Sequence, residues 1–278
     1  MTARSALFGP RGTLDLRSSV VMGVLNVTPD SFSDGGAHDG RAVEVGLAMV
    51  ADGAAIVDVG GESTRPGAAP VSVAEELARV IPVIEGLRRG TEAWISVDTS
   101  KPEVMSAAVA AGADMINDVR ALRGEATLAA AAASGAAVCL MHMQGEPDTM
   151  QDDPRYDDVV AEVSAFLRAR IDACIAAGIS AERIAVDPGI GFGKTLDHNL
   201  ALLRATDELA AIGPPLLIGV SRKSMFGKLL GREVGERLSA SLAAGIHTVL
   251  HGARILRVHD VRETVDALRV IGEIGALR

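Results

Sequence analysis

The sequence predicts a single (β/α)8 TIM barrel with a short N-terminal appendage. Strand-like apolar runs and helical stretches alternate eight times over most of the 278 residues. The composition is 48% hydrophobic but only 3% aromatic, and such aliphatic-rich chains suit helices packed on a buried parallel sheet. Polar side chains follow each apolar run, which is the end of the strands where barrels build their active sites.

The first half of the chain contains four of these strand–helix units. Residues 1–19 show no clear pattern beyond a turn at Pro10-Arg11-Gly12, so we expect an appendage ahead of a catalytic domain at 20–278. Proline is tolerated where Lys101-Pro102-Glu103 begins the third helix, whereas Pro82 inside the second helix predicts a kink or break. Apolar runs predict strands at 20–27, 54–59, 94–97 and 115–116. Helical spacing and an alanine-rich stretch predict the other helices at 41–52, 73–88 and 125–134.

The second half repeats the pattern. Gly178 ends the long fifth helix, as glycine commonly does. Apolar runs predict strands at 137–141, 184–186, 216–220 and 255–258, and helical spacing predicts helices at 157–177, 200–211, 236–250 and 262–274. A doubly wound open sheet is the alternative, but it usually has fewer strands and a single ligand crevice. Eight polar strand ends therefore favour the barrel.

Charge and cysteine content limit the possible partners. The net charge of −9 argues against nucleic acid and anionic membranes, because both would repel most of the surface. Cys139 and Cys174 lack metal-ligand or disulfide-framework spacing, so we expect buried thiols in a reducing compartment. The N-terminus has no apolar signal region, and no apolar run reaches membrane-spanning length. We expect a soluble, cytoplasmic protein.

The stretch IAVDPGIGFGKT at 184–195 resembles a phosphate-binding loop only superficially. A P-loop requires glycine five residues before Gly193, and this chain has Pro188 there. The dinucleotide fingerprint also fails, because its third glycine position holds Lys194. We expect Lys194 to be a surface or helix-entry residue. The feature that remains is Asp187, a carboxylate at the mouth of a strand.

Three other strand ends carry similar groups, and two interpretations compete. Asp58, Asp98, Asn117 and Asp187 are expected to point into the barrel mouth. They could form structural ion pairs and helix caps. Alternatively, they could bind the edge of a flat heterocycle rich in donors, such as a guanine-like or pterin ring, with Lys223 bonding the ring carbonyl.

A second set of side chains is basic. It follows strands two, seven and eight, where barrels often bind phosphate, and comprises Arg65, Arg222, Lys223, Arg257 and His259. Asn26 is the candidate metal ligand through its amide oxygen, and a single protein ligand suits Mg²⁺ better than zinc. We interpret His142 as a packed, hydrogen-bonded side chain. The absence of HExxH, CxxC and Ser-His-Asp patterns removes the basis for peptidase, zinc-hydrolase and thiol-redox activities.

Eight segments in this order resemble the dihydropteroate synthase family, from about Val20 to the last helix. They are NVTPDSFSDGG, VDVGGESTRPGA, SVDTSKPEV, MINDV, CLMHMQGEPDTMQ, VDPGIGFGKTLDHNLALL, GVSRKSMFG and RVHDV. The resemblance implies folate biosynthesis, in which a dihydropterin methyl diphosphate condenses with p-aminobenzoate. It also implies Mg²⁺, no organic cofactor, a homodimer and competition by sulfonamides.

The same resemblance implies a role for each matching residue. Asn26 would contact Mg²⁺ and the diphosphate, Arg257 and His259 would bind the departing diphosphate, and Thr64 would lie near the pterin or its phosphates. The pterin ring would be held by Asp98, Asn117, Asp187 and Lys223. The p-aminobenzoate pocket would be shaped by Phe32, Arg65, Pro66 and Ser224. The catalytic group would then be Asn26, Arg65, Lys223, Arg257 and His259.

The chemistry expected from the residues agrees with this activity. Diphosphate can leave through a cation-like carbon, and the enzyme must bind the anion, exclude water and place the aniline nitrogen. Such an attack needs no strong general base. A pterin-binding methyltransferase and a noncatalytic pterin-binding paralogue are the alternatives. The first would not need Asn26, Arg257 and His259, and the second would have lost residues such as Arg65 or Phe32.

Overall fold

The computed structural model describes residues 4–27, 38–63, 69–146 and 149–275. Eight parallel strands lie in the order β8-β7-β6-β5-β4-β3-β10-β9, and a parallel bridge between Val186 and Leu216 joins the two ends of the sheet. The strands are β3 (Val20–Asn26), β4 (Ile56–Gly60), β5 (Trp94–Asp98), β6 (Met115–Asp118), β7 (Ala137–Met141), β8 (Ile184–Asp187), β9 (Leu217–Ile218) and β10 (Ile255–Val258). The predicted (β/α)8 barrel is confirmed.

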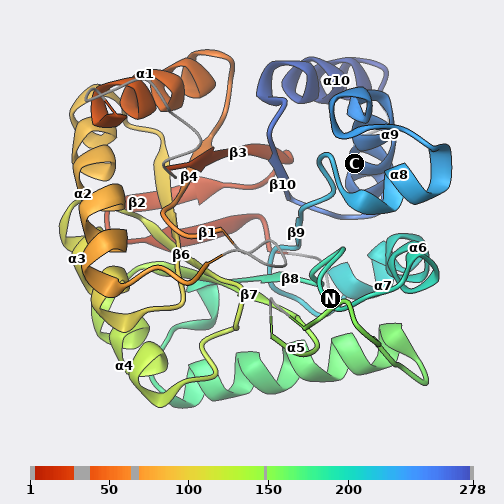
Figure 1. The fold of residues 1–278 in the computed structure, drawn as a ribbon, viewed down its shortest axis with the longest axis horizontal. Helices are drawn as coiled ribbons and strands as arrows, with labels where there is room; N and C mark the ends of the chain where they lie inside the picture. Colours follow the sequence, from red (N-terminus) through yellow and green to blue (C-terminus); the bar gives the residue numbers. More distant parts are fainter. Residues whose placement is uncertain (1–3, 28–37, 64–68, 147–148, 276–278) are drawn as a thin grey trace.

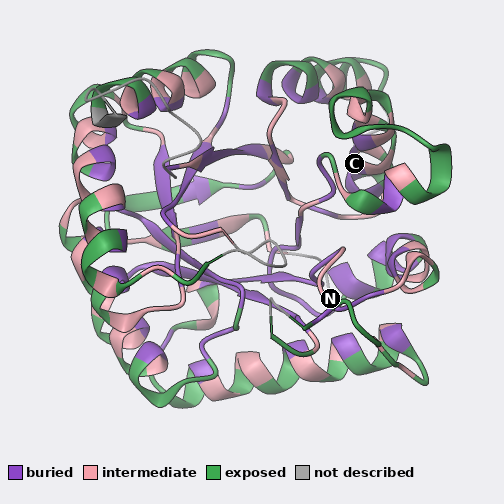
Figure 2. Ribbon diagram, viewed as in Figure 1, coloured by how far each residue is buried: buried purple, intermediate pink, exposed green. Residues whose placement is uncertain are grey.

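Helices form a ring around the strands (Figure 1). They are α1 (His38–Ala51), α2 (Val73–Gly90), α3 (Pro102–Ala110), α4 (Glu125–Ser134), α5 (Val159–Ala176), α6 (Leu196–Arg204), α7 (Thr206–Ala210), α8 (Ser224–Leu230), α9 (Leu238–Leu250) and α10 (Val261–Glu273). The strands are mostly buried, whereas the helices expose their outer faces (Figure 2). The main core lies between the barrel and this ring, as the aliphatic composition predicts.

Two helical predictions need correction, and one helix was not predicted. The predicted break at Pro82 is wrong, because α2 runs through this residue and buries Val80, Val83 and Ile84 on either side of it. This packing outweighs the one backbone hydrogen bond that proline removes. The stretch 200–211 forms parts of two helices, α6 and α7, separated at Ala205. Helix α8, which follows β9, was not predicted.

The N-terminal residues contain a β-hairpin that the sequence did not reveal. Strands β1 (Ala6–Gly9) and β2 (Gly12–Asp15) are antiparallel and joined by the predicted turn. Leu7, Leu14 and Leu16 are buried in one cluster with side chains from the N-terminal ends of the barrel strands, including Ile56 and Trp94. The hairpin therefore covers the end of the barrel opposite the predicted site.

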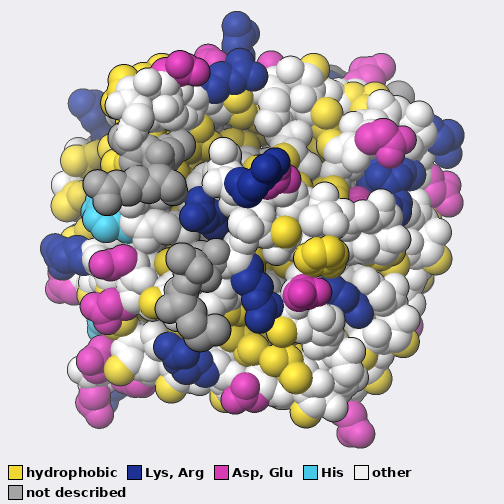
Figure 3. Space-filling view, turned by 180° about the vertical axis from the view of Figure 1, so that it is seen from behind, with side chains coloured by type: hydrophobic (Ala, Val, Ile, Leu, Met, Phe, Trp, Pro, Cys, Tyr) yellow, Lys and Arg dark blue, Asp and Glu magenta, His cyan; other side chains and the backbone are white. Residues whose placement is uncertain are grey.

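The structure also bears on the expectations drawn from charge, hydropathy and cysteine content. Basic and acidic side chains are interspersed on the face behind that of Figure 1, with hydrophobic side chains between them (Figure 3). Among the described residues, no helix has the length and apolar character needed to cross a membrane. Cys139 and Cys174 are both free and buried, as expected.

Candidate active site

The C-terminal ends of four neighbouring strands place polar groups side by side. In the strand register Asn26 pairs with Gly60, Gly60 with Asp98, and Asp98 with Asn117. Asn26 and Asp98 lie on either side of Gly60. A Cβ built there would lie 3.5 Å from Asp98 Cβ and 3.7 Å from Asn26 Oδ1. The structure thus brings Asn26, Asp98 and Asn117 together at one rim of the barrel.

Arg257 of β10 crosses the mouth and pairs with two carboxylates. Its Nε donates to Asp58 Oδ2 and its Nη2 to Asp98 Oδ2, both at 2.7 Å. Asn117 Nδ2 also donates to Asp58 Oδ2 at 3.1 Å. Asp58 is fully buried, and its other oxygen has no hydrogen-bond partner among the described residues. The ion-pair interpretation is therefore correct for Asp58, and Asp98 shares the same arginine.

Burial and charge set the ionisation of this pair. Burial raises the pKa of Asp98 to about 7, although the Arg257 guanidinium lowers it, and the Asp58 carboxylate raises it further. Burial works against the charged form of Arg257, but the Asp58 and Asp98 carboxylates together raise its pKa. Arg257 is therefore a permanent cation, while Asp98 can change charge near neutral pH.

Asp187 and Lys223 lie on the other side of the mouth. Asp187 is 5% exposed, and one of its oxygens accepts from Gly189 N at 2.7 Å. Burial raises the pKa of Asp187, opposed by this hydrogen bond and by the Lys223 charge. Burial lowers the pKa of Lys223 to about 8, with the Asp187 carboxylate acting in the opposite direction. Lys223 Nζ lies 4.2 Å from the centre of the Phe192 ring, within cation–π range.

The remaining described basic residues of the predicted set, Arg222 and His259, lie around β9 and β10. His259 Nδ1 is 3.1 Å from Ser221 Oγ, which also accepts from His259 N. Arg222 is exposed, adopts a left-handed backbone (φ 57°) and pairs with Asp260, with Nε 3.1 Å from Oδ2. Arg257, His259 and Lys223 thus lie at the ends of adjacent strands. Arg222 already has a carboxylate partner in Asp260. Ser224, from the predicted p-aminobenzoate pocket, is exposed at the start of α8.

Lys194 is not a surface residue, which corrects part of the sequence interpretation. It does precede a helix, but it is only 2% exposed, and its Nζ lies 3.0 Å from His142 Nδ1. The expectation for His142 is confirmed, because this side chain is buried and bonded. Burial and the neighbouring Lys194 charge lower the pKa of His142 to about 3, so it stays neutral at physiological pH.

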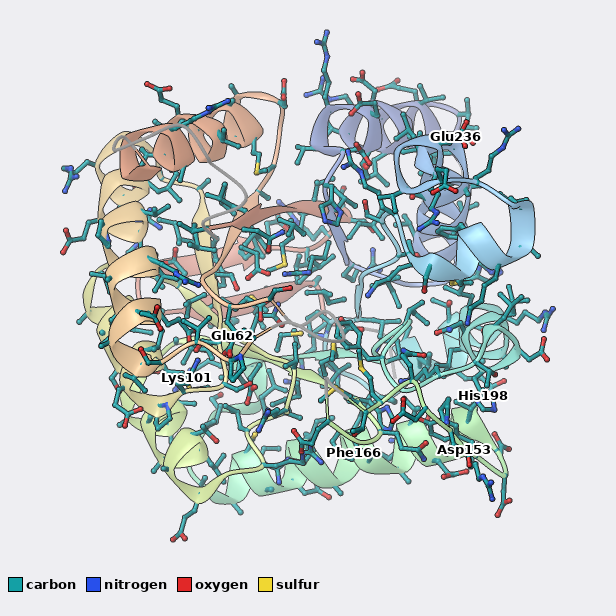
Figure 4. The ribbon with its side chains drawn as sticks, viewed as in Figure 1. Glu62, Lys101, Asp153, Phe166, His198 and Glu236 are labelled. Carbon is teal, nitrogen blue, oxygen red and sulfur yellow. The ribbon has the colours of Figure 1, made fainter. Side chains whose placement is uncertain are left out.

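Four predicted site residues fall outside the described part of the chain: Phe32, Thr64, Arg65 and Pro66. Glu62 lies shortly before residues 64–68 in the chain. It accepts from Val71 N at 2.9 Å and pairs with Lys101 at 2.6 Å (Figure 4). Lys101 also pairs with the fully buried Glu76 of α2. This network, which the sequence did not predict, fixes the described residues on both sides of 64–68.

The donor set at Asn26 is compatible with Mg²⁺ rather than zinc. Among the described residues, no group of three or more His, Cys, Asp or Glu side chains could hold a metal ion. The amide oxygen of Asn26 lies next to Gly60 at the open rim, where substrate oxygens and water could complete a shell. Mg²⁺ is commonly bound in this way, with few protein ligands and several waters.

The sequence matches the pterin-binding enzyme family over residues 22–259. It is also 55% identical over 267 residues to the dihydropteroate synthase of Escherichia coli strain K12, covering 95% of both chains. The chain belongs to the dihydropteroate synthase family.

Solved structures agree with this membership. The Yersinia pestis dihydropteroate synthase in a sulfonamide drug complex superposes with a TM-score of 0.92 at 48% identity, covering 97% of this chain and 98% of that one. The Xanthomonas albilineans dihydropteroate synthase with 4-aminobenzoic acid gives 0.90 at 52% identity, covering 96% of each. The resemblance inferred from eight sequence segments is confirmed, and so is the fold it implies.

Two features of this dihydropteroate synthase site were missed from the sequence. The contacts of Asp58 with Arg257 and Asn117 join residues that are 199 and 59 positions apart, so no local pattern could reveal them. The burial of Lys194 had a weak signal. The glycines around it, which permit close backbone approach, left room for a side chain to fold back under the turn.

Proposed function

We propose that this chain condenses a (7,8-dihydropterin-6-yl)methyl diphosphate with p-aminobenzoate, giving 7,8-dihydropteroate and diphosphate in folate biosynthesis. One structural observation supports this proposal. Groups suited to the edge of a heterocycle and groups suited to an anion lie at the same barrel mouth, with Arg257 between them. A site that must hold a ring and release a charged leaving group needs both sets.

The ring would lie between Asn117, Asp187 and Lys223. The Asp187 carboxylate would accept from the ring's amino group and adjacent N–H, and the Lys223 ammonium would donate to the ring carbonyl. Asn117 can do both, and Asp98 can act as acceptor or donor because its pKa lies at about 7. Asp187 and Asn117 are each 5% exposed. Their hydrogen bonds to the ring would be strengthened because water is excluded there.

The diphosphate would be bound by Arg257 and His259, with Asn26 contacting Mg²⁺ and the phosphate oxygens. Asn26 lies at the open rim beside Asp98, and Lys223 and His259 lie near the adjacent strand ends. Bound Mg²⁺ would supply charge neutralisation for the leaving diphosphate. Arg257 would have to share its donors between the anion and its two carboxylate partners.

The reaction replaces a carbon–oxygen bond with a carbon–nitrogen bond. The bond between the methylene carbon and the diphosphate oxygen breaks, and that oxygen keeps the electron pair. The electron-rich dihydropterin ring stabilises the cation-like carbon that results. The aniline nitrogen of p-aminobenzoate then attacks, and the N–H proton is lost as the product forms. The neutral His142 is not needed as a base, because the attacking amine meets an electron-deficient centre.

The p-aminobenzoate pocket is proposed to contain Phe32, Arg65, Pro66 and Ser224, with Thr64 near the pterin. Ser224 is exposed at the first turn of α8, next to Lys223. Sulfonamides would compete there as aminobenzoate mimics.

An alternative function is a pterin-binding methyltransferase or a noncatalytic pterin-binding protein. Retention of Asn26, Arg257 and His259 at one mouth favours diphosphate chemistry over methyl transfer, and retention of Arg65 and Phe32 favours catalysis over binding alone. The deciding assay mixes purified protein with Mg²⁺, the pterin diphosphate and p-aminobenzoate. Equimolar diphosphate and dihydropteroate are expected. Absence of both products while the ring still binds would exclude the synthase function.

We also propose that the protein is a cytoplasmic homodimer. The free state of Cys139 and Cys174 suits a reducing compartment. Large apolar side chains are half-exposed on the last three helices, including Leu229, Leu250 and Val270, and a second subunit could cover them. Light scattering should give twice the monomer mass.

A further inference from the structure

The buried Lys194 has no part in the proposed reaction, yet its ammonium group is fully bonded. Its Nζ lies 3.0 Å from Gly189 O, from Phe192 O and from His142 Nδ1, and 3.4 Å from His142 O. An ammonium has three protons to donate, and three acceptors lie at 3.0 Å. His142 therefore accepts at Nδ1, which places its own proton on Nε2.

These acceptors belong to two different barrel loops. Gly189 and Phe192 follow β8, whereas His142 follows β7. The two backbones are in direct contact, since a Cβ at Gly189 would lie 1.9 Å from His142 O and one at Gly193 would lie 2.4 Å from Gln144 O. Glycine at these positions, with φ of 68° and 60°, permits this approach. Lys194 adds buried hydrogen bonds across this contact, which Gln151 and Tyr156 also bridge by donating to Gly191 O at 2.7 Å and to Gly193 O at 2.9 Å.

The turn held by Lys194 also shapes the proposed ring pocket. Gly189 N donates to Asp187 Oδ1 at 2.7 Å, which orients that carboxylate. The ring of Phe192 lies 4.2 Å from Lys223 Nζ, and a Cβ at Gly191 would lie 3.2 Å from Lys223 Cδ. The positions of Asp187 and Lys223 therefore both depend on this turn.

The charge of Lys194 also acts on the ionisation of Asp187. Burial lowers the pKa of Lys194 to about 7, while the Asp187 carboxylate raises it. In return, the Lys194 charge lowers the pKa of Asp187, together with Lys223 and Arg257. In its protonated form, Lys194 is therefore a cation behind the turn that favours the ionised form of the Asp187 carboxylate in front of it.

We propose that Lys194 is a positioning residue for pterin recognition, whose buried ammonium fixes the turn 188–193 against the end of β7 so that Asp187 and Lys223 meet the ring edge in one geometry. This proposal rests on the proposed function for the identity of the ring. If Lys194 had a purely structural role, its substitution would lower the stability of the fold without a selective loss of pterin affinity.

The test compares Lys194→Met, which keeps an unbranched side chain one atom shorter and removes the charge and the hydrogen-bond donors, with Arg183→Met. The Arg183 guanidinium also donates to backbone oxygens, including Ala136 O at 2.9 Å, but it lies at the start of β8, at the opposite end of the strand. Calorimetry with 6-hydroxymethyl-7,8-dihydropterin gives the ring affinity without turnover. Thermal unfolding gives the stability, and steady-state kinetics gives KM for each substrate.

Lys194→Met should raise the dissociation constant of the pterin and KM for the pterin diphosphate by about tenfold or more, because displacement of Asp187 and Lys223 would weaken their charge-assisted hydrogen bonds to the ring. KM for p-aminobenzoate should stay within about twofold, because the turn lies on the ring side of the pocket. Arg183→Met should lower the unfolding temperature and leave both KM values unchanged. Unchanged pterin affinity in Lys194→Met, or an equal rise of both KM values, would overturn the proposal.

A pair of substitutions at His142 provides a second route if Lys194→Met does not fold. His142→Asn keeps an acceptor close to the position of Nδ1, whereas His142→Leu removes it. The first should bind the pterin almost like the unmodified protein, and the second should bind it more weakly. Equal binding by both would contradict the proposal. If the unmodified protein binds the pterin but does not turn over, the proposed function fails while this comparison still holds.

Discussion

At the scale of single residues, the barrel mouth holds charges that are almost entirely removed from water. Asp58 is fully buried, and Asp187 is 5% exposed. Isolated charges in such places cost several kcal/mol, so they persist only with partners. Arg257 supplies the partner for Asp58, and Lys223 and Lys194 lie close enough to Asp187 to act on its ionisation. The same arrangement leaves acceptors and donors aimed at the mouth, where a ring can use them.

Asp187→Ala is expected to weaken binding of the pterin ring strongly, because the ring's donors lose their charged acceptor. Loss of one such hydrogen-bonded pair typically weakens binding by about 10- to 100-fold. Calorimetry with the ring compound measures the effect. Asp197→Ala is the matched control, since Asp197 is an exposed carboxylate in the first turn of α6. Unchanged affinity in Asp187→Ala would remove this residue from the ring site.

Asp98 is expected to titrate near pH 7 in the ligand-free protein. The folded-state pKa lies above the ordinary value of 3.8, so ionisation of Asp98 opposes folding, and its contribution to stability falls as the pH rises from about 4 to about 7. Carbon-13 NMR of the carboxyl group measures the midpoint directly. Arg257→Met should move it upward, because the guanidinium favours the ionised form. A midpoint near 4 in the unmodified protein would contradict this assignment.

At the scale of elements, the loop between β4 and α2 is held at both sides of residues 64–68. Glu62 bonds Val71 N, and Lys101 connects Glu62 to the buried Glu76. Helix α2 itself begins with a capping box between Ser72 and Glu75, which fixes its first turn. The described residues on both sides of 64–68 are thus fixed to the barrel.

Arg65→Ala is expected to raise KM for p-aminobenzoate by about tenfold while changing KM for the pterin diphosphate by less than about twofold, because a single charge-assisted hydrogen bond is removed from one pocket. Steady-state kinetics with each substrate varied in turn measures both values. Arg79→Ala provides a control in the adjacent helix, where the guanidinium donates to Gly61 O at 2.8 Å. A parallel rise of both KM values in Arg65→Ala would indicate a general role in closing the site.

At the scale of the whole molecule, the two ends of the barrel have different tasks. The C-terminal end collects the polar groups, whereas the hairpin closes the N-terminal end with Leu7, Leu14 and Leu16. An ion pair also joins the hairpin to the barrel. Arg11 and Arg88 bond the two oxygens of Asp114, which is fully buried just ahead of β6, at 3.1 and 2.8 Å. This separation lets stability and chemistry be tested independently.

Leu7→Ala is expected to lower the free energy of unfolding by about 2–5 kcal/mol, because it leaves a cavity at the closed end of the barrel. Urea denaturation measures this loss, and kcat at a temperature where the protein is folded should stay unchanged. Phe8→Ala on the same hairpin is the control, since Phe8 is 41% exposed. A loss of kcat in Leu7→Ala without loss of stability would mean that the hairpin acts on the site.

The sequence alone determined the barrel, because the alternation of apolar runs and helical spacing is local and each strand marks its own end with a polar residue. It also determined the family, through segments such as SVDTSKPEV and GVSRKSMFG. Only the tertiary structure decided that Arg257 joins Asp58 and Asp98, that Lys194 is buried beneath its glycine turn, and that the first residues form a hairpin under the barrel. These features depend on contacts between distant segments, and the packing energy that selects them is absent from any short stretch of chain.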